Sequence, residues 1–181
     1  MKIVAVLGSP HKDGPSNTIA REVLRGAADA GYEVVEYVIN DMNVRGCQGC
    51  KACKNNKIDC ILPDDLKPYW KDLHECDALL VAAPNYCSQI CGPMITYMNR
   101  HYCLITADGV RVHPGIKLIG VFSQGAPSYQ AADDAYDWFL GDFQNRDMVL
   151  HAKIVHTGKE DWGPDSEIMK RAYEAGKSLQ R

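Results

Sequence analysis

The alternation of two apolar patterns limits most strongly what this 181-residue chain can fold into. A continuous apolar run predicts a strand at residues 2–7, buried on both faces of a parallel sheet and ended by Gly8. From Ser16 onward the apolar residues recur with helical spacing, until Gly31 ends the pattern. This helical stripe consists of Ile19, Val23, Leu24, Ala27 and Ala28.

The same alternation continues along the rest of the chain. Further strands are predicted at residues 33–39, 77–83, 117–122 and 148–155. Further helices are predicted at residues 63–75, 93–101 and 128–145, and a last helix, capped by Asp165, carries Ile168, Ala172, Ala175 and Leu179 on one face. Residues 101–115 are irregular, with 111–114 as a short strand or a loop. We therefore expect an α/β fold of three layers, with helices on both faces of a doubly wound, five-stranded parallel sheet.

Length and charge narrow the class of protein further. The length suits one domain, residues 1–181, with a Cys-rich loop at about residues 46–62. The 20 basic and 23 acidic residues give a net charge of −3 without a basic run, so we expect no nucleic-acid partner. The apolar runs are too short for a membrane helix or a signal peptide. We therefore expect a cytoplasmic protein with no membrane partner, whose eight cysteines are reduced thiols or metal ligands.

The loop between the first strand and the first helix, residues 8–18, has the composition of a phosphate site. In a doubly wound sheet, ligands bind at the carboxyl ends of the strands, and small and hydroxyl residues here precede a helix N-terminus. The chain has neither of the common glycine-rich nucleotide loops after this strand, which disfavours ATP hydrolysis and a dinucleotide site. An ordinary polar turn is the alternative. The candidate phosphate-binding residues are Ser9, Pro10, His11, Ser16, Asn17 and Thr18.

Two further loops follow predicted strands at the same edge of the sheet. After the third strand, Pro84 and Tyr86 offer a flat apolar wall, and after the fourth, Gln124 and backbone amides offer hydrogen bonds to a heterocycle. A planar ring could lie between these loops. The candidate ring-binding residues are Pro84, Asn85, Tyr86, Cys87, Ser88, Ser123, Gln124 and Gly125.

These loops together resemble those of the NAD(P)H-dependent FMN reductase family, including its iron-sulfur flavoproteins. The resemblance covers nearly the whole chain and rests on Gly8-Ser9-Pro10, Ser16-Asn17-Thr18, Pro84-Asn85-Tyr86 and Ser123-Gln124-Gly125. It implies a flavodoxin-like fold with strand order 2-1-3-4-5, FMN as cofactor, and a homodimer or homotetramer. It also implies that the first loop binds the FMN phosphate and that the isoalloxazine ring lies between the other two. Thr96 departs from the pattern, since the family often has a Lys there.

The spacing Cys47-x-x-Cys50-x-x-Cys53-(x6)-Cys60 is the sharpest chemical signal in the sequence. Three thiolates at two-residue gaps can hold one side of a 4Fe-4S cube, and a short loop can bring a fourth to the remaining iron. Gly46 and Gly49 permit the tight backbone that this requires. The motif with the following Pro63-Asp64-Asp65-Leu66 resembles that of the iron-sulfur flavoproteins, which implies one 4Fe-4S cluster per chain. We expect the loop to project from the same sheet edge as the flavin.

Other interpretations of the cysteines and charges stay open. The motif could also hold zinc, form a redox disulfide or bind no metal. Cys76 and Cys103 are typical of buried apolar residues. Asp64 and Asp65, like Asp133 and Asp134, are interpreted as charge at a helix N-terminus or on a solvated helix face.

Three functions fit these observations. The leading hypothesis is an oxidoreductase that passes electrons between FMN and a 4Fe-4S cluster, with no catalytic acid or base, and takes them from NAD(P)H or a redox protein. The second is a cluster-free NAD(P)H-dependent FMN or quinone reductase. The third is a non-enzymatic electron shuttle like flavodoxin, which accepts electrons from a protein partner alone.

Overall fold

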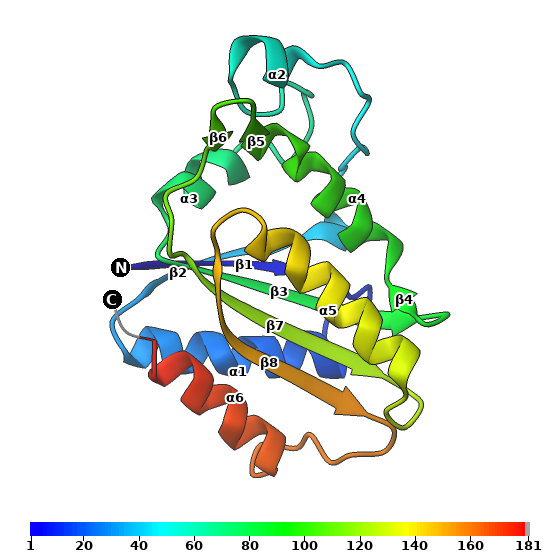
Figure 1. Cartoon of the computed structure of the whole chain (residues 1–181). Coiled ribbons are helices and arrows are strands. Elements are labelled where there is room, and N and C mark those ends of the chain that lie inside the picture. The colour runs from blue at the N-terminus through cyan, green and yellow to red at the C-terminus, as the bar shows by residue number, and fades with distance from the viewer. Residues whose placement is uncertain (180–181) are drawn as a thin grey trace.

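A five-stranded parallel sheet forms the middle layer of the protein in the computed structural model, which describes residues 1–179 (Figure 1). The strands are β1 (Lys2–Leu7), β2 (Glu33–Val38), β3 (Ala78–Tyr86), β7 (Lys117–Gln124) and β8 (Val149–Thr157). Their order, β2-β1-β3-β7-β8, is the expected order 2-1-3-4-5, because β7 and β8 are the fourth and fifth strands of the parallel sheet. The carboxyl ends of all five strands therefore meet at one edge.

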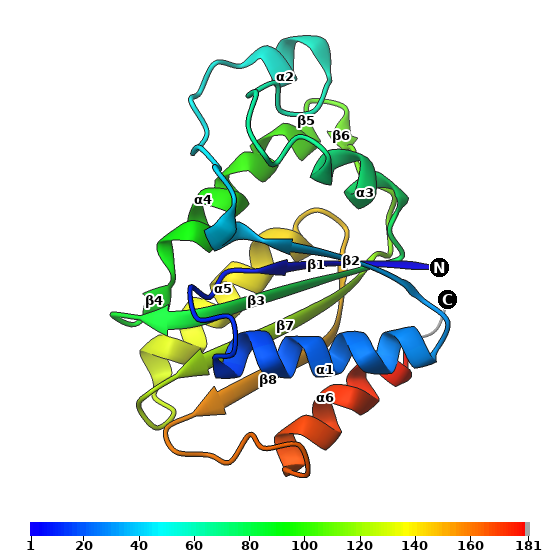
Figure 2. The same ribbon diagram turned by 180° about the vertical axis from the view of Figure 1, so that it is seen from behind.

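Helices cover both faces of this sheet, as the two opposite views show (Figures 1 and 2). One face carries α1 (Pro15–Asp29) and α6 (Glu167–Lys177). The other face carries α3 (Tyr69–Glu75), α4 (Gly92–Arg100) and α5 (Gln130–Gln144). Among residues 1–179, no helix is long and apolar enough to cross a membrane.

The alternation of side chains along β1 divides the core into two layers. Val4 and Val6 pack toward α3, α4 and α5, whereas Ile3, Ala5 and Leu7 pack toward α1 and α6. All five side chains are fully buried. The continuous apolar run in this strand thus reflects burial on both faces of the sheet, as expected.

Two glycines let α1 and α6 pack at unusually short range. A Cβ atom on Gly26 would lie 2.1 Å from the backbone oxygen of Tyr173, and one on Gly176 would lie 1.9 Å from that of Val23. Both distances are too short for any side chain. The close contact of these two helices therefore depends on both glycines, although neither has a positive φ angle.

Several predicted boundaries were wrong. The helix predicted at residues 63–75 begins only at Tyr69, because the preceding residues form turns. The cap of α6 is Ser166 rather than Asp165, and Ala28 is exposed although it was assigned to the apolar stripe of α1. Of the two interpretations left open for residues 111–114, the structure shows the loop.

The structure also contains short elements that the sequence patterns did not reveal. A hairpin of β5 (Ile105–Thr106) and β6 (Gly109–Val110) lies in the irregular region. The strand β4 (Gln89–Ile90) pairs antiparallel with the end of β3, and α2 (Ala52–Asn56) lies within the Cys-rich loop. These elements are too short for hydrophobic periodicity to identify them.

Candidate functional site

A cavity of about 300 Å³ lies at the carboxyl edge of the sheet, near the lower end of the size range of small-molecule sites. The loop after β1, the last residues of β3, and the ends of β7 and β8 with the residues that follow them contribute to it. Its lining residues are Ser9, His11, Pro15, Pro84, Asn85, Tyr86, Ser123, Gln124, Gly125, His156, Gly158 and Trp162. The structure therefore brings the three predicted ligand loops together around one space.

The predicted phosphate loop is shaped by the buried side chain of Asn17. Its Nδ2 atom donates hydrogen bonds to the backbone oxygens of Ser9, at 3.4 Å, and His11, at 3.2 Å. The Ser9 Oγ atom accepts a hydrogen bond of 3.2 Å from the His11 backbone N–H. Pro10, Ser16, Asn17 and Thr18 do not line the cavity. Asn17 thus holds the loop in shape from behind.

The N-terminus of α1 can receive an anion beside this loop. Its N-cap residue, Gly14, provides no side-chain cap, and the first turn contains no acidic residue. The Ser16 Oγ atom is buried, and within residues 1–179 it has no hydrogen-bond partner. Free N–H groups at a helix N-terminus together with an unused hydroxyl are the donors that a phosphate group requires.

Gly8 has a packing role in this loop. A Cβ atom there would lie 2.1 Å from the Met94 Cγ atom of α4 and 3.2 Å from the Ala82 backbone oxygen of β3. The backbone N–H of Gly8 also donates a 2.8 Å hydrogen bond to that same oxygen. A glycine is therefore needed so that α4 can pack against the start of the loop.

The loop after β3 is a tight hairpin that leads into β4. Cys87 and Ser88 form its tip, and both have left-handed backbones, with φ angles of 53° and 63°. Two such residues in succession are typical of a two-residue hairpin turn, and they are unfavourable for side chains other than Gly, Asn or Asp. Neither residue lines the cavity, whereas Pro84, Asn85 and the half-exposed Tyr86 do.

The side chain of Gln124 is occupied by its own surroundings. Its Nε2 atom donates to the backbone oxygens of Ala126 and Pro127, and its Oε1 atom accepts a 2.6 Å hydrogen bond from the Tyr136 hydroxyl. The side chain of Asn85 also lies beside the Tyr136 hydroxyl, but its buried Nδ2 atom has no close hydrogen-bond partner within the described chain. Asn85 is therefore held less firmly than Gln124 by its own surroundings.

Sequence reasoning missed the part of the cavity that the end of β8 and the residues after it supply. His156, Gly158 and Trp162 all line it, and Pro15 lines it from within the predicted phosphate loop. The His156 ring is buried beside Trp162, at 6.5 Å between centroids, and its Nε2 atom lies 3.0 Å from the Glu160 backbone oxygen. Because β8 neighbours β7 in the predicted strand order, the loop after the fifth strand was a signal that could have identified these residues.

The four motif cysteines form a separate group in the Cys-rich loop. All four line one cavity, together with Arg100, Tyr102 and Cys103. Cys53 is buried, and this burial raises the pKa of its thiol. Within the described residues, no three His, Cys, Asp or Glu side chains lie close enough to hold a single metal ion. A 4Fe-4S cube distributes its four ligands over four iron atoms, so a shared cavity is the relevant geometry.

The backbone of this loop is tightly curved. Gly49 has a φ angle of 62°, and Lys51 and Lys57, which flank α2, have left-handed values of 58° and 54°. Gly46 is not in this conformation, so the prediction that glycines permit a tight backbone here applies to Gly49 alone. The loop is thus wrapped around its cysteines by three residues with positive φ angles.

Arg100 and Asp64 anchor the loop from inside the protein. Both side chains are almost completely buried, and they form an ion pair. Burial alone would raise the pKa of Asp64, but the hydrogen bonds from Arg100 and from the Arg45 backbone N–H outweigh it, and the pKa lies below its usual value. The prediction that Asp64 is charge at a helix N-terminus or on a solvated helix face is therefore wrong.

Two cysteines outside the motif have the apolar role predicted for them. Cys76 and Cys103 are buried, and burial raises the pKa of each thiol to about 12. Such thiols are neutral and unreactive near pH 7. Cys91 is also buried, whereas Cys87 is exposed at the hairpin tip.

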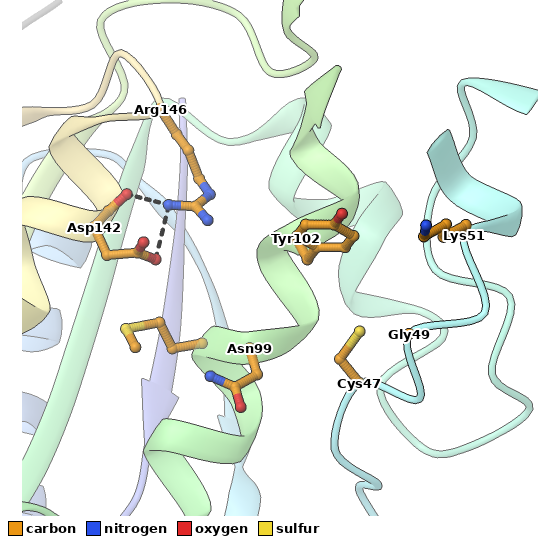
Figure 3. Close-up of a pocket in the computed structure, with 8 residues that line it drawn as sticks. Cys47, Gly49, Lys51, Asn99, Tyr102, Asp142 and Arg146 are labelled. Atoms are coloured by element: carbon orange, nitrogen blue, oxygen red, sulfur yellow. Dashed lines mark hydrogen bonds and ion pairs between the residues drawn. The ribbon is translucent and has the colours of Figure 1, made fainter. Parts of the chain in front are cut away.

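A third cavity, of about 410 Å³, lies between the Cys-rich loop and the carboxyl-terminal parts of α4 and α5 (Figure 3). Cys47 lines both this cavity and the one that the four cysteines share. An ion pair of 2.7 Å between Arg146 and Asp142 lies on its α5 side. The cavity that the four motif cysteines share and the cavity at the sheet edge have no lining residue in common.

The position of the loop differs from the expected one. The chain leaves β2 at the carboxyl edge, but α2 lies outside α3 and α4, away from β4 (Figures 1 and 2). The reason is the length of the loop, which carries the cysteines beyond the edge before Arg100 and Asp64 fix it. The strand order predicted the edge at which the loop leaves the sheet, but not the final position of its cysteines.

Comparisons with known proteins agree with the fold. The chain is 25% identical to an iron-sulfur flavoprotein of Methanosarcina thermophila over 99% of this chain and 93% of the relative. It is 31% identical to an iron-sulfur flavoprotein of Archaeoglobus fulgidus, a match that spans 55% of this chain and 45% of the relative.

Solved structures and a family model complete the comparison. An NAD(P)H:quinone oxidoreductase from Methanothermobacter marburgensis superimposes with a TM-score of 0.75 at 19% identity, covering 100% of this chain and 96% of the other. A flavodoxin from the domain Archaea superimposes with a TM-score of 0.59 at 13% identity, covering 98% and 94%. These likenesses establish the flavodoxin-like fold. Residues 1–139 match the model of the NADPH-dependent FMN reductase family, and the chain therefore belongs to this family.

Proposed function

We propose that the protein is an FMN-dependent oxidoreductase that transfers electrons between FMN and a 4Fe-4S cluster held by Cys47, Cys50, Cys53 and Cys60. The observation that carries this proposal is that all four cysteines line one cavity in a chain of an FMN reductase family. The names of the two iron-sulfur flavoproteins among its relatives support the cluster.

The cavity at the sheet edge fits FMN. The unpartnered Ser16 hydroxyl and the free N-terminus of α1 would bind the phosphate, with Ser9 and Thr18 beside them. Asn85 would donate a hydrogen bond to the ring system, and Tyr86 would shield one side of it. Pro10, His11, Asn17, Cys87, Ser88 and Gln124 remain candidates, with Asn17 and Gln124 acting on the shape of the loops.

The ligand chemistry of the Cys-rich loop suits a cluster, and the cavity of about 10 Å³ that the four cysteines share would have to widen around it. The four thiols would act as the ligands, the residues with positive φ angles wrap the backbone around them, and Arg100 donates a hydrogen bond to the sulfur of Cys60. When bound, FMN supplies hydride chemistry and single-electron chemistry, whereas an iron-sulfur cluster supplies single-electron chemistry alone. The chain itself binds, orients and insulates these groups, and no catalytic acid or base is assigned.

NAD(P)H or a redox protein would serve as electron donor. The family description, NADPH-dependent FMN reductase, favours the nucleotide. A homodimer or homotetramer is the proposed assembly. Because the two cavities have no lining residue in common, a second subunit could also bring a flavin closer to the cysteines.

One preparation tests the proposal. Protein purified without oxygen should show flavin absorption over a broad shoulder, about one FMN, and about four iron and four sulfide atoms per chain. The substitution Cys50→Ser should remove the iron and sulfide but leave the FMN. Cys103→Ala is the matched control, because Cys103 lines the same cavity outside the motif and should be dispensable for iron.

The outcomes separate the possible functions. A flavin spectrum without iron in the unmodified protein would contradict the cluster and leave a cluster-free reductase. In that case, fast bleaching by NADPH or NADH would support the reductase. Slow bleaching by both nucleotides would instead favour an electron shuttle like flavodoxin.

A further inference from the structure

We propose that Arg100 is a positioning residue that raises the reduction potential of the cluster through a hydrogen bond to Cys60. The inference rests on the proposed function, since it requires a cluster at the motif cysteines. The Arg100 Nε atom donates to the Cys60 Sγ atom at 3.2 Å. Arg100 is 1% exposed and Cys60 is partly exposed, so the arginine side of this contact is closed to water.

The guanidinium is held in place by the two ends of the Cys-rich loop. Its Nη1 atom donates to the Arg45 backbone oxygen at 2.8 Å, where the chain enters the loop. Both terminal nitrogens donate to Asp64, where the chain leaves it. With three partners on a planar group, the N–H that points at Cys60 has little freedom to turn away.

Asp64 is itself fixed independently of Arg100. Its carboxylate accepts hydrogen bonds from the backbone N–H groups of Arg45, at 3.1 Å, and Leu66, at 3.3 Å. The orientation of Arg100 is therefore determined by a carboxylate that cannot move without disturbing both ends of the loop.

Other cations near the loop bond to different groups. Arg111 bonds to Asp59 at 2.9 Å and to the Cys103 backbone oxygen, and Lys54 bonds to the backbone oxygens of Tyr102 and Ile105. Within residues 1–179, no side chain other than Arg100 donates a hydrogen bond to the sulfur of a motif cysteine. Its role thus differs from that of a cation that merely clamps the loop.

The direction of the effect follows from charge. Hydrogen bonds to the ligand sulfurs and nearby charges are among the main influences on the potential of an iron-sulfur cluster. Reduction adds one electron and makes the sulfurs more negative, so a donor that carries positive charge favours the reduced state. The carboxylate of Asp64 opposes this effect. Removing Arg100 should therefore lower the potential, and neutralising Asp64 should raise it.

Redox titration of the cluster, followed by electron paramagnetic resonance of the intact protein, tests the inference. Arg100→Gln should favour the oxidised state at least tenfold, which is about 59 mV for a one-electron couple. Arg100→Lys should shift the potential in the same direction by less, because the charge remains. Asp64→Asn should shift it in the opposite direction. Arg111→Gln is the matched control for the loss of a nearby charge without a hydrogen bond to sulfur, and it should lower the potential by much less than Arg100→Gln does.

The outcomes are distinct from those of the proposed function. If the unmodified protein binds no iron, the proposed function fails, and this inference fails with it. If iron is bound and Arg100→Gln leaves the potential unchanged, the inference alone is overturned. If Arg100→Gln does not fold, Arg100→Lys and Asp64→Asn decide, and shifts of the same sign in both would contradict the role of charge. A purely structural role would change thermal stability without these opposite shifts.

Discussion

Ser16→Ala should make the protein without FMN more stable and its binding of FMN weaker. The Ser16 hydroxyl is buried in the second position of α1 and has no partner within the described residues. If this hydroxyl binds the phosphate of FMN, its burial destabilises the FMN-free protein, whereas its hydrogen bond stabilises the complex with FMN. The two effects have opposite signs, which an unrelated change in packing would not produce.

The magnitude in the absence of FMN follows from desolvation. A buried hydroxyl without a hydrogen bond costs about 1–3 kcal/mol. Alanine is also the better helix former, by a few tenths of a kcal/mol. We expect the free energy of unfolding to rise by about 1 kcal/mol or more. For a chain of this length, each 1 kcal/mol corresponds to about 2–4 °C in melting temperature.

The magnitude in the presence of FMN follows from the lost donor. A hydrogen bond to a charged group contributes about 1.5–3 kcal/mol, and 1.4 kcal/mol corresponds to a factor of ten in affinity. The dissociation constant for FMN should therefore rise by about 10- to 100-fold. Because a ligand stabilises the folded state according to its concentration relative to this constant, the FMN-induced increase in melting temperature should shrink as well.

The assay combines thermal unfolding of the FMN-free protein with quenching of flavin fluorescence on titration with FMN. Ser166→Ala is the matched control. Ser166 is also a serine at the start of a helix whose buried Oγ atom lacks a partner in the described chain, but it belongs to the N-terminus of α6 and not to that of α1, which follows the phosphate loop. It should show the change in stability without the change in affinity. An unchanged FMN affinity in Ser16→Ala would refute the phosphate assignment.

Two further predictions concern stability. Gly176→Ala should lower the free energy of unfolding by about 3 kcal/mol in chemical denaturation, because its Cβ atom would lie 1.9 Å from the Val23 oxygen, whereas Gly141→Ala, with open space around it, should be neutral or slightly stabilising. Equal stability of the two variants would contradict the close helix contact. Burial, aided by the charge of Arg146, holds the pKa of His101 well below 6.5, so the unfolded chain binds more protons below that pH. Stability should therefore fall by up to about 1.4 kcal/mol per pH unit as the pH decreases below about 6.5, and His101→Gln should flatten this slope in denaturation at pH 5 to 7. A slope that is unchanged in the variant would show that His101 is protonated in the folded state.

Much of the fold could be predicted because apolar periodicity reports burial directly. The strand at residues 2–7 was predicted with its observed bounds, since all its side chains after Lys2 are buried. The β4 strand and the hairpin of β5 and β6 could not be predicted, because two residues carry no period. The start of α3 was placed too early, because the acidic residues before it resembled those of a first helical turn.

The candidate sites also contain parts that the sequence predicted and parts that it did not. Loops after strands were predictable from strand order, and eight predicted residues from three loops line one cavity. The part contributed by His156 and Trp162 was missed, although the same rule applied to the fifth strand. The roles of Asn17 and Gln124 within their own loops could not be predicted, because the direction of an amide depends on backbone oxygens that only the folded loop brings near.

The buried ion pair of Arg100 and Asp64 could not be predicted from the sequence, and its partners indicate what it does. A buried ion pair adds little to stability, because the desolvation of both charges offsets their attraction, and an apolar replacement of equal volume is often as stable. Here, however, each charge has further partners, Cys60 and Arg45 for the guanidinium, and two backbone N–H groups for the carboxylate. An apolar pair could fill the same space, but it could present no donor to the sulfur of Cys60. The chemistry of the loop, more than its stability, therefore accounts for a charged pair at this position.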